Sequence, residues 1–139
     1  MRFAKPEELD QVITCNEHFR NFPRENISKK VERKEIIVAL ENEKMIGVIS
    51  FEYIWTTRPY ISSIFVHPEF RRQNVGSELL AYLAEFLSSR GYHYLYSSTE
   101  DNSESAKSWH LKNGFTVSGA LDGLNLPNKI REIFFYKSI

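Results

Sequence analysis

The 139-residue sequence has one cysteine, Cys15, and no run of about eighteen apolar residues. A lone cysteine cannot form an internal disulfide and fits a reducing compartment. Without a long apolar run we expect no membrane span. The first residues lead straight into charged sequence and lack the apolar segment of a signal peptide, so we expect a cytoplasmic protein.

Net charge and metal-ligand clusters are also missing. The 18 lysines and arginines balance the 18 aspartates and glutamates, so the formal net charge at pH 7 is zero. General attraction to nucleic acid is therefore not expected. The four histidines are scattered and Cys15 has no partner at ligand spacing, so we expect no metal site. The length, without repeats or linkers, predicts one domain over residues 1–139.

Hydrophobic periodicity alternates between strand-like and helix-like segments along the chain. We predict strands at 1–4, 36–40, 45–55, 60–66, 92–98, 115–121 and 130–137, with helices starting at Pro6, within 16–35, over 77–90 and over 103–113. Strands and helices alternate in the middle, and strands gather at both ends. This order predicts an α/β fold with a mixed sheet and helices on both faces.

A basic turn from Arg71 to Ser77 joins an apolar strand to a strongly amphipathic helix. The first amides of a helix have no helical partner, and the helix dipole favours an anion there. Asn74 and Gly76 tolerate positive φ, so the turn can point several amides inward. Arg71 and Arg72 add charged donors. The spacing fits neither a Walker loop nor a dinucleotide fingerprint, yet it predicts a phosphate-binding turn.

This turn resembles the coenzyme A pyrophosphate loop of the GNAT N-acetyltransferase superfamily. The family pattern is Arg/Gln-x-x-Gly-x-Gly/Ala, and the sequence reads Arg71-Arg72-Gln73-Asn74-Val75-Gly76. Asn74 replaces the first glycine and is the next-best residue for a left-handed turn.

A second block, residues 102–115, resembles the other signature of this family, Asn-x-x-Ala-x-x-aromatic-Tyr-x-x-x-Gly-Phe. The matching residues are Ala106, Trp109, Gly114 and Phe115. Two positions depart from the pattern, because Ser103 stands in place of the asparagine and His110 in place of the tyrosine.

The resemblance covers essentially the whole chain and implies a GNAT-like sheet splayed between residues 60–66 and 92–98, where the pantetheine arm inserts. It implies acetyl-CoA as cosubstrate and an amine as acceptor. The coenzyme-binding residues that it implies are Ile64, Phe65, Val66, Arg71, Arg72, Gln73, Asn74, Val75, Gly76, Ser77, Ser103 and Ala106.

Acetyl transfer needs a neutral attacking amine and a proton for the departing thiolate. Glu52 interrupts an apolar strand near its exit, which makes it the candidate general base; a solvated edge glutamate is the alternative. His110 holds the position of the family's tyrosine, on one helix face with Ala106. With a pKa near the ordinary value of about 6.5 it could protonate the thiolate; a merely packed histidine is the alternative.

Residues 19–26 and the expected loop 122–128 lie where the family builds its acceptor pocket. Both mix aromatic or apolar, charged and amide groups, which indicates a polar small molecule or a peptide end. Two functions stay open: an N-acetyltransferase acting on a primary amine by direct attack in a ternary complex, or a non-catalytic acyl-CoA-binding module that acts through a protein partner. The presence of both Glu52 and His110 favours the enzyme, and a homodimer is left open.

Overall fold

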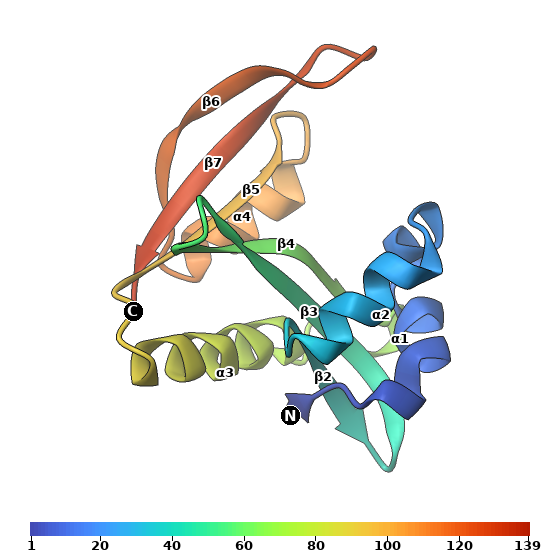
Figure 1. The fold of residues 1–139 in the computed structure, drawn as a ribbon. Helices are drawn as coiled ribbons and strands as arrows, with labels where there is room; N and C mark the ends of the chain where they lie inside the picture. The colour runs from blue at the N-terminus through green and yellow to red at the C-terminus, as the bar shows by residue number, and fades with distance from the viewer.

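The computed structural model describes all of residues 1–139 as a seven-stranded sheet with helices against it (Figure 1). The strand order is β1-β2-β3-β4-β5-β7-β6. The strands are β1 (Arg2–Phe3), β2 (Ile36–Glu41), β3 (Lys44–Ile54), β4 (Arg58–Val66), β5 (Tyr94–Glu100), β6 (Thr116–Asn125) and β7 (Ile130–Ser138). The helices are α1 (Leu9–Cys15), α2 (Arg24–Glu32), α3 (Val75–Ser89) and α4 (Glu104–Lys112), with short 3-10 turns η1 (Pro6–Glu8), η2 (Glu17–Asn21) and η3 (Pro68–Phe70).

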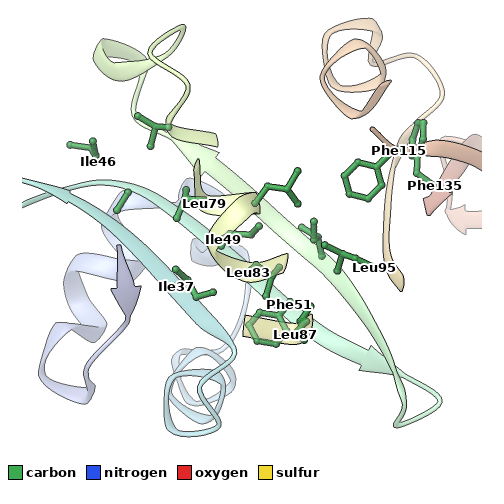
Figure 2. Close-up of a cluster of buried hydrophobic side chains, with 14 residues drawn as sticks. Ile37, Ile46, Ile49, Phe51, Leu79, Leu83, Leu87, Leu95, Phe115 and Phe135 are labelled. Carbon is green, nitrogen blue, oxygen red and sulfur yellow. The ribbon is translucent and has the colours of Figure 1, made fainter. Parts of the chain in front are cut away.

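Two apolar clusters lie on opposite faces of the sheet, and neighbouring residues of β2 divide between them. Ile37 faces the cluster that α3 covers with Leu79, Leu83 and Leu87, one helical turn apart (Figure 2). Val38 faces the second cluster, which includes side chains of α1 and α2. The prediction of an α/β fold with helices on both faces is therefore confirmed. None of the helices combines the length and apolar character that crossing a membrane requires.

The sheet opens between β4 and β5, the only strands that run parallel. Their register holds a single pair, Tyr60 with Tyr96. In contrast, β4 pairs with β3 along its whole length. The part of β4 from Ile61 to Val66 therefore keeps one backbone edge free of strand pairing, and the predicted splay is confirmed.

Most predicted boundaries differ from the structure by one or two residues, and the start of α3 and the end of β6 bear on the predicted site. Helix α3 begins at Val75 instead of residue 77, because the left-handed Asn74 (φ 63°) directly precedes it. Residues 122–125, predicted as loop, belong to β6, whose pairing with β7 extends to Asn125 and Ile130. The register of the pairing between β6 and β7 shifts between Leu121 and Asn125. This irregularity lets the strand continue past Asp122 and Gly123, which usually form turns.

Candidate functional site

A pocket of about 430 Å³ lies where β4 and β5 diverge. Ile64 and Phe65 of β4 line one wall. Ser97 of β5, with Ala106 and His110 of α4, lines the other. The strand that precedes the Arg71–Ser77 turn and the helix that carries the second motif therefore meet at one cavity.

A second pocket of about 530 Å³ adjoins the first, and His18, Ser62 and Ser63 line both. Glu52 is exposed to solvent and lines this second pocket. Its carboxylate takes part in no ion pair or hydrogen bond, so it is free to accept a proton from a molecule bound there. The structure thus places the candidate base beside the cavity between the strands.

The two segments expected near an acceptor lie in different places. Phe19, Phe22 and Asn26, from the segment 19–26, line the second pocket. Residues 122–128 line neither of these two pockets and form the far end of the β6–β7 hairpin (Figure 1). Continued pairing with β7 carries them beyond the body of the sheet.

The turn before α3 leaves several backbone amides without helical partners, but one of its two positive φ angles lies at another residue than the sequence predicts. Asn74 is left-handed, whereas the second positive φ lies at Arg72 (φ 66°) and Gly76 is helical. The first helical bond in this turn runs from the Glu78 amide to the Asn74 carbonyl. The amides of residues 75–77 therefore lack helical partners at the positive end of a 15-residue helix.

The two arginines of this turn have different environments. Nε of Arg71 donates to the Val66 carbonyl at 2.9 Å, and its guanidinium lies 5.5 Å from the centre of the Phe65 ring. Arg71 therefore braces the turn against β4. Arg72 is exposed and has no partner within the chain, so its whole guanidinium is free for an anion. Gln73 donates to the Glu69 carbonyl at 3.4 Å.

Gly76 of α3 lies against side chains of α4 and β4. A Cβ at this position would lie 3.3 Å from Nε1 of Trp109 and 3.7 Å from Cδ1 of Ile64. A larger residue would push these elements apart or fill the space beside the first pocket. Ser103 precedes α4 as its N-cap residue, and its side chain forms no capping bond.

His110 is buried, with 4% of its surface exposed, and it stacks on Phe135 at a centroid distance of 4.4 Å. Nδ1 lies 2.7 Å from the Ala106 carbonyl, which can only accept, so this nitrogen carries the proton. Nε2 therefore accepts from the Ser97 hydroxyl at 2.8 Å. Burial lowers the pKa of His110, so the expectation of an ordinary pKa is corrected.

This burial predicts an acid-sensitive stability. Because the pKa of His110 is lower in the folded protein, the unfolded chain binds more protons as the pH falls below about 6.5. We expect the free energy of unfolding to drop on acidification, and to drop less in His110→Gln. Urea titrations at several pH values measure this, with the exposed His93→Gln as control. An equal acid-induced loss in the parent and in His110→Gln would contradict the assignment.

Sequence reasoning missed the serine hydroxyl groups of β4 and β5. Ser63 accepts from Nδ2 of the buried Asn16 at 2.7 Å, and Ser98 donates to Glu132 at 2.6 Å. The Tyr60 hydroxyl lies 2.5 Å from Oγ of Ser98. The available signal was the serine doublet in each strand, because paired hydroxyls are unusual in a strand core.

The model of the acetyltransferase (GNAT) family matches residues 5–115. A ribosomal-protein-alanine N-acetyltransferase from Brucella melitensis superimposes with a TM-score of 0.83 at 21% identity, over 99% of this chain and 98% of its own. A candidate acetyltransferase from Salmonella typhimurium, solved with its cofactor acetyl-CoA, gives 0.82 at 19% identity, over 99% and 91%. A candidate streptothricin acetyltransferase from Bacillus anthracis, in complex with acetyl coenzyme A, gives 0.68 at 26% identity, over 75% and 61%. No curated protein matches the sequence.

Proposed function

Because the chain belongs to the acetyltransferase (GNAT) family, we propose that it transfers an acetyl group from acetyl-CoA to a primary amine by direct attack in a ternary complex. The observation that carries this proposal is the pair of adjoining pockets at the open edge of β4. One pocket suits a narrow coenzyme arm, and the other offers a free carboxylate to an amine. Two structural neighbours that hold acetyl-CoA support this choice of cosubstrate.

In this proposal the coenzyme runs from the α3 turn into the cavity between the strands. Its pyrophosphate meets the amides of residues 75–77 and the free guanidinium of Arg72. Its pantetheine arm follows the unpaired edge of β4 past Ile64, Phe65 and Val66, beside Ala106 of α4. Of the remaining predicted contacts, Asn74 and Ser103 are the N-cap residues of α3 and α4. Arg71 and Gln73 hold the turn by donating to the Val66 and Glu69 carbonyls.

The acceptor enters the second pocket as an ammonium ion and gives one proton to Glu52, directly or through water. The neutral nitrogen then attacks the thioester carbon, and its bond to carbon forms while the carbonyl oxygen becomes an oxyanion. Backbone amides of β4 are fixed donors for that charge. The oxyanion re-forms the carbonyl as the carbon–sulfur bond breaks, which releases the coenzyme thiolate, and the nitrogen gives its second proton to water.

We infer that His110 helps to return a proton to the thiolate and that it acts through the Ser97 hydroxyl, without touching the sulfur itself. A protonated ring would donate through the Ser97 hydroxyl to the sulfur. Because burial lowers the pKa of His110, this contribution belongs to the acid side of the pH profile. A coenzyme thiolate with a conjugate pKa of about 8.5 can leave without it at higher pH.

Thiol release from acetyl-CoA tests the proposal. We expect release that depends on an added amine, with one acetylated amine formed for each free thiol. A panel of primary amines, amino acids and peptides with free N-termini serves as acceptor. Tight acetyl-CoA binding without transfer to any acceptor would favour the non-catalytic binding module instead.

A further inference from the structure

The second pocket holds both signs of charge, and most of the charged groups are already paired. Nζ of Lys30 lies 3.2 Å from the Glu35 carboxylate and donates to the Phe51 carbonyl at 2.8 Å. Nζ of Lys29 lies 3.1 Å from Glu25, one helical turn away on α2. Lys30 is therefore held within the chain, whereas the Lys29 pair is exposed to solvent and weak.

Two charged side chains of the pocket are left without a partner. Glu52 is one, and Arg33, which follows the last residue of α2, is the other. Both are exposed, and neither forms an ion pair or a side-chain hydrogen bond. The pocket therefore offers one free carboxylate and one free guanidinium to whatever binds there.

Backbone pairing holds these two residues near each other. The amide of Phe51, which directly precedes Glu52, donates to the Glu35 carbonyl at 3.0 Å. Arg33 lies two residues before Glu35, and two residues span at most about 7 Å. Both residues also line the same pocket of about 530 Å³, so one bound molecule can contact both.

We propose that the acceptor is a small primary amine that also carries a carboxylate, with its ammonium group toward Glu52 and its carboxylate on Arg33. This inference rests on the proposed acetyl transfer and names the substrate class. An arginine matches a carboxylate with two parallel hydrogen bonds, and Lys30, the half-buried lysine of the pocket, is already bonded to Glu35 and to the Phe51 carbonyl. The N-terminal amine of a protein has no free α-carboxylate and has a carboxylate at a comparable distance only where its first residue is acidic, so the pocket favours free amino acids.

Matched acceptors test this inference. L-alanine, β-alanine and 4-aminobutanoate place the carboxylate at three different distances from the amine. For the best of these three acceptors, we expect kcat/KM to exceed that of its own carboxamide by about tenfold or more. Arg33→Gln is expected to remove most of this preference while leaving the carboxamide within about twofold. Lys129→Gln, an exposed change in the β6–β7 turn, is expected to leave both values unchanged.

The possible outcomes separate the choice of acceptor from acetyl transfer itself. Equal rates for the acids and their amides, or a preference that survives Arg33→Gln, would overturn the inference while acetyl transfer stands. Preference for phosphoethanolamine over every carboxylate, or for peptides over amino acids, would overturn it as well. No transfer to any amine would remove the proposed function, and this inference would fall with it.

Discussion

Replacing Glu52 with glutamine is expected to lower turnover at pH 7 by roughly 10²-fold for an acceptor that is protonated at that pH. The amide keeps the shape of the side chain and removes the group that takes the proton. Glu52 is exposed and unpaired in the second pocket, so the substitution disturbs no internal contact. Initial rates at saturating acetyl-CoA measure the effect.

The pH dependence separates a lost base from general damage. Near and above the pKa of the acceptor amine the base is no longer needed, so the loss in Glu52→Gln should shrink as the pH rises. Glu85→Gln, an exposed change on α3, is the matched control and should keep the rate of the parent. Full turnover of Glu52→Gln at pH 7 would assign the proton to another group or to bulk water.

The second large effect is expected on acetyl-CoA binding, from a change in the Arg71–Ser77 turn before α3. Arg72→Ala is expected to raise the acetyl-CoA dissociation constant roughly ten- to a hundredfold, the range for losing about 1.5–3 kcal/mol of charged hydrogen bonding. Arg72 has no partner within the chain, so the change removes a ligand contact only. Lys129→Ala is matched in charge, exposure and positive φ and should bind normally in calorimetric titrations.

Gly76→Val tests the same site by shape. Its side chain would press on Trp109 and Ile64, narrowing the space beside the coenzyme arm, and a loss of affinity at least as large is expected. Gly119→Val is the control, because a Cβ at Gly119 would meet nothing within 4 Å. Unchanged affinity in both Arg72→Ala and Gly76→Val would remove the α3 turn from the coenzyme site.

The sequence predicts the elements and the coenzyme turn because both depend on short-range patterns. The leucines of α3 repeat at helical spacing, and Asn74 favours the left-handed turn before the helix, so each pattern predicts its own local conformation. The β6 boundary was missed because Asp122 and Gly123 have the same turn signature whether a strand ends or shifts register.

The chemistry of individual side chains depends on contacts that no local pattern contains. His110 occupies the predicted position, but burial lowers its pKa. Its ring stacks on Phe135 and bonds to Ser97, which belong to two different strands. Likewise Arg71 and Arg72 look equivalent in the sequence, and only the fold shows that one braces β4 while the other is free.

The structure of the protein with coenzyme A bound tests the central claim most directly. We expect the pyrophosphate to lie on the amides of residues 75–77 and the sulfur to lie in the pocket between β4 and β5, beside Phe65 and Ala106. We also expect the sulfur to face the pocket that Glu52 lines. A coenzyme bound elsewhere, or a sulfur walled off from that pocket, would contradict it.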